Sequence, residues 1–248
     1  MSTVSLRFRD NIAVIRMKNG AANPISPRLV DDLREILSQC RNRARGLVLN
    51  SGAKFFSIGF DLPLLLKLNR KEMADFWYGF NDLCLELRTV KIPAVCMLAG
   101  HAMSGGNMLA LTSDFRFAST DNKIIGFNEV SLGIPVPYLA EMILRQVVGD
   151  DHAESIMGTG AFMSFADAEK VGFVDEIHPL EDLEEKAIQK TLEMAMLEEP
   201  SYTVLKSGRV KGIEAAYRKN REVRNEMFLD SWFSGPIRKK LAEAAGKF

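Results

Sequence analysis

The sequence contains little cysteine, and its charges cancel. Its 248 residues include three cysteines, with no CxxC pair and no Cys/His spacing of the kind that binds zinc. Disulfide and zinc scaffolds are therefore excluded, and a reducing compartment is favoured over secretion. Because 32 Lys and Arg residues balance 32 Asp and Glu residues, no domain-wide basic surface is available for non-specific binding to nucleic acid.

Targeting and membrane-spanning segments are also lacking. Residues 92–113 carry no charge and are long enough to cross a bilayer, but Pro93 lies at their start and a glycine-rich polar turn interrupts them. They are better interpreted as a buried strand, a tight turn and a buried helix. The first ten residues alternate and carry charges, unlike a signal peptide, and the final Gly-Lys-Phe is not a peroxisomal signal. We expect a cytoplasmic protein with no membrane partner.

The composition is typical of a globular protein with a large core, because 47% of the residues are hydrophobic and 26% are charged. Period-two alternation predicts a hairpin over residues 4–17 that turns at Asp10 and Asn11. Alternating strands and helices follow, at residues 27–40, 46–49, 72–87, 94–99, from about 105, and 114–118. Such alternation predicts an α/β fold with a largely parallel sheet. From Tyr138 onward the pattern is mainly helical.

Two glycine-containing turns follow buried strands, at residues 57–62 and 100–107. Glycine lets a backbone approach a ligand closely, and two N–H groups that converge on one oxygen form an oxyanion hole. Taken alone, such turns are more often a matter of packing. Neither turn has the spacing of a phosphate loop or a dinucleotide fingerprint.

Several short motifs occur in a fixed order along the chain. They are Asn23-Pro24, KFFSIGFDL at 54–62, IPAV at 92–95, GHAMSGGNMLAL at 100–111, SDFRFA at 113–118, GFNEVSLGI at 126–134 and ADAEKVGFVDEI at 166–177. In this order, over roughly residues 4–180, the chain resembles the crotonase (enoyl-CoA hydratase/isomerase) superfamily.

The resemblance implies a spiral of ββα turns followed by a C-terminal helical region. We assign residues 1–190 to the spiral core and residues 191–248 to a C-terminal helical trimerisation region. The family binds acyl-CoA thioesters, so we expect acyl-CoA as the substrate, with no separate cofactor and no metal. We also expect a homotrimer or a hexamer. The apolar residues among the C-terminal charges suggest such an oligomer; they include Met227, Phe228, Trp232 and Phe233.

The resemblance also assigns roles by position. The backbone amides of Phe60 and Gly105 match the two donors that hold the thioester oxygen. The Phe60 side chain is then free to act as a pocket residue. The residues expected to bind the substrate are Lys54, Ser57, Ile58, Gly59, Asp61, Gly106, Met108, Phe127 and Ile134. Lys54 matches a residue near the CoA nucleotide, although an exposed lysine there serves solubility equally well. We expect His101 and Asp114 to be structural.

The acid and base residues distinguish reactions within the family. Hydratases resemble one another in two glutamates, and Met108 occupies the position of the first, where a thioether cannot take a proton from water. Glu129 occupies the position of the second. Burial among Phe127, Val130 and Ile134 should raise its pKa and make it a suitable base near neutral pH. A single glutamate suits proton shuttling, and the chain resembles the Δ3,Δ2-enoyl-CoA isomerases most closely.

Other activities remain open at this point. Asn107, Tyr138 or Glu141 would replace the missing carboxylate in a hydratase. A decarboxylase or a hydrolase of CoA thioesters would use the same oxyanion hole, and a non-catalytic acyl-CoA-binding protein would need no base. A dehalogenase is disfavoured, because Pro137 stands where that branch carries its aspartate. Outside the family context, Glu129 would be read as a surface carboxylate in an ordinary salt bridge.

Overall fold

The computed structural model describes residues 2–52, 54–197 and 200–246. The chain begins with the predicted hairpin, in which β1 (Val4–Arg9) pairs antiparallel with β2 (Ile12–Met17). Asp10 and Asn11 have φ angles of 51° and 64°. Two successive left-handed residues form the turn whose twist suits a two-residue hairpin, and short polar side chains tolerate this conformation.

The main sheet has the strand order β1-β2-β3-β5-β7-β10. Its later strands are β3 (Gly46–Asn50), β5 (Ala94–Leu98), β7 (Phe115–Ser119) and β10 (Glu176–His178). Every pairing after the hairpin is parallel. The largely parallel sheet that the alternation of strands and helices predicted is therefore confirmed.

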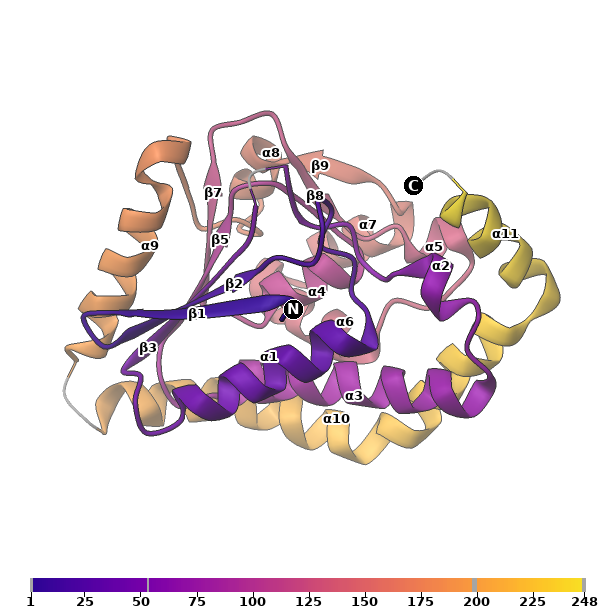
Figure 1. The fold of residues 1–248 in the computed structure, drawn as a ribbon, viewed down its shortest axis with the longest axis horizontal. Coiled ribbons are helices and arrows are strands. Elements are labelled where there is room, and N and C mark those ends of the chain that lie inside the picture. The colour runs from indigo at the N-terminus through magenta and orange to yellow at the C-terminus, as the bar shows by residue number, and fades with distance from the viewer. Residues whose placement is uncertain (1, 53, 198–199, 247–248) are drawn as a thin grey trace.

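Side chains alternate between the two faces of the main sheet, and each face contributes to a separate hydrophobic core. Ile12 and Val14 face the helix α9 (Leu180–Ala195), whereas Ala13 and Ile15 face the larger core on the other side. That larger core is shared with α1 (Pro27–Cys40) and α3 (Arg70–Thr89). In Figure 1, α9 covers the sheet at the left, and α1, α3 and the long α10 (Ser201–Phe233) form a helical layer below it.

A second, smaller sheet was not predicted. It has the order β4-β6-β8-β9, with β4 (Phe55–Ser57), β6 (His101–Met103), β8 (Ile124–Gly126) and β9 (Phe162–Ser164). Each of β4, β6 and β8 follows a strand of the main sheet and precedes a helix. This repeated ββα unit is the spiral that the sequence led us to expect.

Seven further helices complete the described part of the chain. They are α2 (Leu62–Leu65), α4 (Gly105–Leu111), α5 (Glu129–Leu132), α6 (Tyr138–Val148), α7 (Asp150–Thr159), α8 (Phe165–Lys170) and α11 (Gly235–Ala245). The segment 92–113 forms the predicted strand, β5, and the predicted helix, α4, but the short strand β6 lies between them where a tight turn alone was expected. In the part of the chain that the structure describes, no helix has the length and hydropathy needed to span a membrane.

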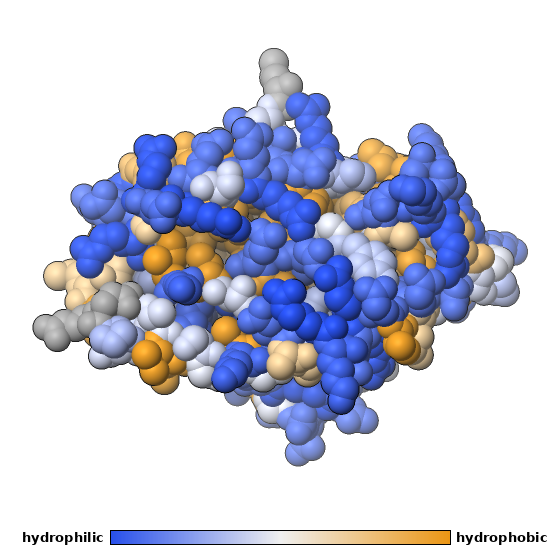
Figure 2. Space-filling model, turned by 90° about the horizontal axis from the view of Figure 1, so that it is seen from below, coloured by the Kyte–Doolittle hydropathy of each residue, from blue (hydrophilic) through white to orange (hydrophobic). Residues whose placement is uncertain are grey.

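Part of the apolar C-terminal segment packs inside the chain itself. The rings of Phe228 and Trp77 stack with their centroids 3.5 Å apart, and Trp232 is fully buried beside Phe228. Two of the residues expected to mediate oligomerisation are therefore buried within the chain, and Phe228 stabilises the contact between α10 and α3. Figure 2 shows, from below, a mainly hydrophilic surface with separate hydrophobic patches. The exposed apolar side chains of α10 are Val204, Leu205, Val223 and Met227. The oligomeric state and the division at residue 190 stay predictions.

A buried ionic cluster anchors α10 to the main sheet. Asp114, before β7, accepts hydrogen bonds from Lys206 Nζ at 2.7 Å, from the Tyr202 hydroxyl at 2.8 Å and from the backbone N–H of Ala94 at 2.9 Å. Arg209 also forms an ion pair with this carboxylate. The expectation that Asp114 is structural is confirmed.

Candidate active site

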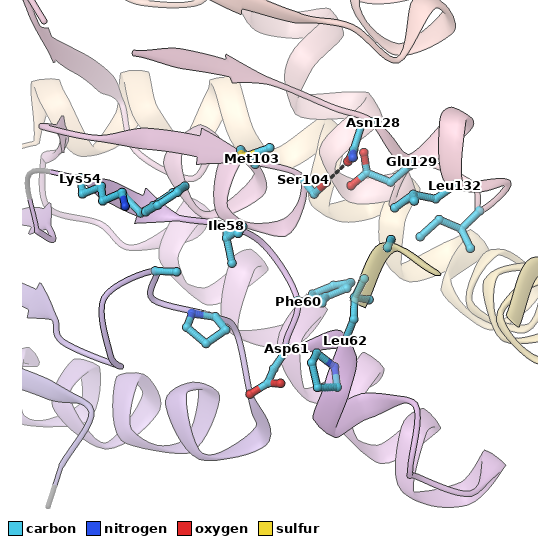
Figure 3. A pocket seen from close by; sticks show the side chains of 16 residues that line it. Lys54, Ile58, Phe60, Asp61, Leu62, Met103, Ser104, Asn128, Glu129 and Leu132 are labelled. Atoms are coloured by element: carbon cyan, nitrogen blue, oxygen red, sulfur yellow. Dashed lines mark hydrogen bonds between the residues drawn. The ribbon is translucent and has the colours of Figure 1, made fainter. Parts of the chain in front are cut away.

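A cavity of about 500 Å³ lies beside the second sheet, where the two glycine turns meet α2, α5 and α11. Figure 3 shows side chains from these elements converging on it. The lining residues are Ala22, Pro24, Lys54, Phe55, Ile58, Phe60, Asp61, Leu62, Pro63, Met103, Ser104, Asn128, Glu129, Leu132, Ile134 and Ala244. Most of these side chains are apolar, so the cavity suits a ligand with a hydrocarbon part.

The two glycine turns touch each other. Gly59 has a φ of +96°, and a Cβ there would lie 3.0 Å from Ser104 Cβ and 3.5 Å from the backbone nitrogen of Gly105. Ser57 fixes the first turn, because its hydroxyl donates to the carbonyl of Asn23 at 2.7 Å and accepts from the N–H of Gly59 at 3.1 Å. Glycine at position 59 is therefore required both by the backbone conformation and by the close approach.

The backbone N–H of Phe60 is directed away from its neighbouring segment. Ile25 donates to the carbonyl of Gly59 at 2.8 Å and accepts from the N–H of Asp61 at 3.0 Å. In this parallel bridge the groups of residues 59 and 61 point toward Ile25, so the N–H of Phe60 points to the opposite side. It donates to no group among the described residues.

Gly105 supplies a second available N–H. It is the first residue of α4, where a helix leaves its N–H groups without an intrahelical acceptor. Gly106, the next residue, packs against β4, because a Cβ there would lie 2.6 Å from the carbonyl oxygen of Ser57. The N–H groups of Phe60 and Gly105 therefore lie on two turns that are in contact.

The ring of Phe60 is fixed by aromatic neighbours on α3. It makes edge contacts with Phe76, Trp77 and Phe80, at centroid distances of 5.4, 5.9 and 5.1 Å. Such contacts favour one ring position. The ring also packs on Gly105, since a Cβ on that glycine would lie 2.9 Å from Phe60 Cε1. The side chain therefore forms an apolar wall and holds the two turns together.

Glu129 is a buried carboxylic acid in the cavity wall. It begins the single-turn helix α5, and only 3% of its surface is exposed. Burial raises its pKa to about 7, although the Ser104 hydroxyl and the backbone N–H groups of Asn128 and Glu129 lower it in part. Within the described chain, its Oε2 has no hydrogen-bond partner. An acid of this pKa both accepts and returns a proton at neutral pH.

The predicted site residues divide into two groups. Lys54, Ile58, Phe60, Asp61, Glu129 and Ile134 line the cavity, with Lys54 and Glu129 at opposite ends in Figure 3. Ser57, Gly59, Gly105, Gly106, Met108 and Phe127 lie behind this lining. Asp61 caps α2, because its carboxylate accepts from the N–H of Leu64 at 3.1 Å. Met108 and Phe127 are fully buried, so they support the site from the core.

The side chains considered as replacements for a second carboxylate do not line the cavity. Asn107 is fully buried, and within the described residues its side-chain amide has no hydrogen-bond partner. The Tyr138 hydroxyl accepts from Asn220 at 3.3 Å, and Glu141 pairs with Arg145. His101 accepts from the backbone N–H of Ile124 at 3.1 Å, which confirms its structural role.

Several lining residues were missed in the sequence. Ser104 and Asn128 lie inside the recognised motifs, and the Ser104 hydroxyl donates to Asn128 Oδ1. Ala244, on α11, comes from the far end of the chain and carries no local signal. Across residues 2–52, 54–197 and 200–246, no group of three or more His, Cys, Asp or Glu side chains is placed to hold a metal ion.

Comparison with known proteins places these observations in a family. The model of the enoyl-CoA hydratase/isomerase family matches residues 7–242. Mitochondrial enoyl-CoA delta isomerase 1 of Mus musculus is 32% identical over 180 residues, which are 71% of this chain and 62% of that protein. The chain thus matches less than two thirds of the mouse relative. A cytoplasmic location for this chain stays a prediction.

Solved structures of enoyl-CoA isomerases and hydratases superpose on this chain. The human mitochondrial delta3-delta2-enoyl-CoA isomerase superposes with a TM-score of 0.94 at 25% identity, over 99% of this chain and 97% of that one. An enoyl-CoA hydratase, EchA3, from Mycobacterium ulcerans Agy99 superposes with a TM-score of 0.85 at 27% identity, over 91% and 99%. Both an isomerase and a hydratase therefore share this fold.

Proposed function

Because the chain belongs to the enoyl-CoA hydratase/isomerase family, we propose that it moves the double bond of a 3-enoyl-CoA thioester from C3 to C2. The resemblance in the sequence to the crotonase superfamily, close to its isomerases, is confirmed, and so is the crotonase-type α/β fold with a C-terminal helical region. The observation that carries the proposal is a single buried carboxylic acid, with a pKa of about 7, in the cavity wall near two available backbone N–H groups.

The proposed reaction needs one proton carrier. The thioester oxygen accepts hydrogen bonds from the N–H groups of Phe60 and Gly105. Ionised Glu129 removes a proton from C2, and the electron pair of that C–H bond moves into a dienolate held by the two donors. Protonated Glu129 then returns the proton to C4, which leaves the double bond at C2. Each donor of this kind contributes about 3 to 4 kcal/mol to stabilisation of the transition state.

The arrangement of carboxylates favours isomerisation over hydration. Hydration needs a water molecule and a group to activate it, and Met108 occupies the position at which hydratases carry their first glutamate. Among the residues that line the described cavity, the acids are Glu129 and Asp61, and Asp61 already caps α2. We propose that Lys54, exposed at the far end of the lining, contacts the CoA part of the substrate.

The first test follows the substrate directly. Purified protein is incubated with trans-3-hexenoyl-CoA in one sample and trans-2-hexenoyl-CoA in another, and NMR spectra are recorded over time. We expect migration of the double bond in the first sample and no 3-hydroxyacyl-CoA in either. Substantial hydration would contradict the single-carboxylate mechanism. No reaction in either sample would point to another CoA-thioester chemistry or to a binding function.

The pair of amide donors is tested by Gly105→Ala. The added Cβ would lie 2.9 Å from Phe60 Cε1 and 3.2 Å from Ile25 Cδ1, so the turns must separate and the donors lose their shared target. Because the two N–H groups would then no longer point at the same thioester oxygen, we expect kcat for double-bond migration to fall by a factor of about 10² to 10³. Steady-state kinetics measures this loss, and circular dichroism checks that the variant is folded.

Gly79→Ala is the matched control for that variant. Its added Cβ would lie 4.0 Å from the nearest atom, Val30 Cγ1, and Gly79 does not line the cavity. We expect an unchanged kcat. Full activity in folded Gly105→Ala would contradict the expectation that the added Cβ displaces the amide donors, because alanine keeps the backbone N–H.

A further inference from the structure

Ser104 has a backbone conformation that a side chain makes costly. It connects β6 to α4, immediately before the proposed donor Gly105, and has a φ of +50°. With a ψ of −123° it also lies outside the left-handed helical region, and a residue other than glycine in such a conformation costs about 1 kcal/mol or more. Both backbone groups are fixed, because the Ser104 N–H donates to Gly126 at 3.0 Å and its carbonyl accepts from Met108 at 3.1 Å. Glycine would adopt this turn freely, so the serine side chain calls for another explanation.

The Ser104 hydroxyl lies beside the proposed proton carrier. It lines the cavity and donates to Asn128 Oδ1, and Asn128 directly precedes Glu129. Figure 3 shows this hydrogen bond with the Glu129 carboxyl group next to it. This hydroxyl also lowers the pKa of Glu129 in part, against the larger effect of burial. Meanwhile Glu129 Oε2 accepts no hydrogen bond from the described residues.

A hydroxyl group has one hydrogen to donate and two lone pairs that accept. It therefore donates either to Asn128 Oδ1 or to Glu129. An ionised carboxylate is the stronger acceptor, whereas a protonated one has its own O–H and needs an acceptor. The two protonation states of Glu129 thus favour opposite directions of the same hydrogen bond.

We propose that Ser104 is a positioning residue for the reaction, whose hydroxyl donates to ionised Glu129 and, once Glu129 is protonated, turns to Asn128 Oδ1 and accepts from the Glu129 O–H. No bond of Ser104 breaks, and the transferred proton stays with Glu129 until it reaches C4. The carboxyl group is then held in one place during both proton transfers. This inference rests on the proposed isomerase function.

The test uses Ser104→Ala and Ser104→Gly, which both remove the hydroxyl. Alanine keeps a Cβ at this position of positive φ and therefore keeps the backbone strain, whereas glycine removes the strain. Because a hydrogen bond to the charged form is lost, we expect the acidic limb of the pH profile of kcat/KM to move upward by about one unit in both variants. At pH 7 we expect kcat/KM with trans-3-hexenoyl-CoA to fall about tenfold.

Ser131→Ala is the matched control, since Ser131 is an exposed serine on α5, the helix that carries Glu129. Its pH profile should equal that of the unaltered protein. If the acidic limb of the kcat/KM profile lies at the same pH in both Ser104 variants as in the unaltered protein, the proposal is overturned. A shift in Ser104→Ala alone would also overturn it, because backbone strain would then be the cause.

A measurement without substrate separates this inference from the proposed function. The pKa of the Glu129 carboxyl group is followed by ¹³C NMR in the unaltered protein and in Ser104→Gly, with Glu129→Gln used to assign the signal. A higher pKa in Ser104→Gly supports the contact with Ser104, and an equal pKa overturns it. Absence of double-bond migration in the unaltered protein would instead overturn the isomerase function.

Discussion

Glu129→Gln is expected to slow double-bond migration by a factor of about 10³ to 10⁴, near the upper range for loss of a general acid–base group. The effect is large because no other acid that lines the described cavity is free to carry the proton. Glutamine has nearly the same shape, so binding of the CoA thioester should persist. Stopped-flow or steady-state kinetics measures the rate, and calorimetry with a saturated acyl-CoA measures the binding.

Glu141→Gln provides the matched control. Glu141 lies on α6, pairs with Arg145 and does not line the cavity, so its replacement should leave the rate unchanged. A rate within tenfold of the parent in Glu129→Gln would mean that a different group moves the proton.

The same variant should reveal what the buried acid does to stability. Burial raises the pKa of Glu129 from 4.5 to about 7, so the folded state disfavours the charged form. This cost is small below pH 4.5, grows as the pH rises to about 7, and is constant above that. Relative to the parent, Glu129→Gln should gain about 2 to 3 kcal/mol in free energy of unfolding between pH 5 and pH 8. Urea denaturation at the two pH values measures the gain, and a constant difference would contradict the raised pKa.

Asp114→Asn should lower the free energy of unfolding by about 3 to 5 kcal/mol, the usual cost of breaking a buried ion pair from one side. The side chains of Asp114 and Lys206 are 1% and 2% exposed. The amide would leave the Lys206 ammonium group buried without its counterion. Urea denaturation at pH 7 measures the loss.

Asp75→Asn is the matched control for this stability effect. Asp75 pairs with Lys71 on the exposed face of α3, with side-chain exposures of 67% and 84%, and such pairs contribute less than about 1 kcal/mol. A similarly small loss in Asp114→Asn would mean that water reaches Lys206 when its partner is removed.

The sequence predicted those parts of the fold whose signals are local. The hairpin strands and β3, β5 and β7 have five or six residues each, enough for alternation or an apolar run to be recognised. The strands of the second sheet and β10 of the main sheet were not predicted, because they have three residues each, too few for a pattern. The turns and Glu129 were found because each lies within a continuous motif.

The burial of individual side chains and the contacts between distant segments could not be predicted, because they depend on the three-dimensional arrangement. The motif placed Met108 at the cavity, but α4 is buried on all sides and holds this side chain in the core. The apolar spacing near the C-terminus suggested subunit contacts, whereas Phe228 stacks on Trp77 of α3 and Trp232 is buried beside Phe228. The role of Ala244 in the lining follows from the docking of α11 beside α2 and α5, which no pattern within α11 could indicate.

This docking of α11 bears on how the protein folds. Ile237 of α11 packs on Gly133, and the guanidinium group of Arg238 donates to the carbonyl of Leu66. Ala244 lines the same cavity as Ala22, from the other end of the chain. Contacts between such distant parts of a chain close a long loop, and such non-local contacts slow folding. We therefore expect the cavity to form late, so that a partly folded chain exposes its apolar walls to water instead of enclosing a thioester.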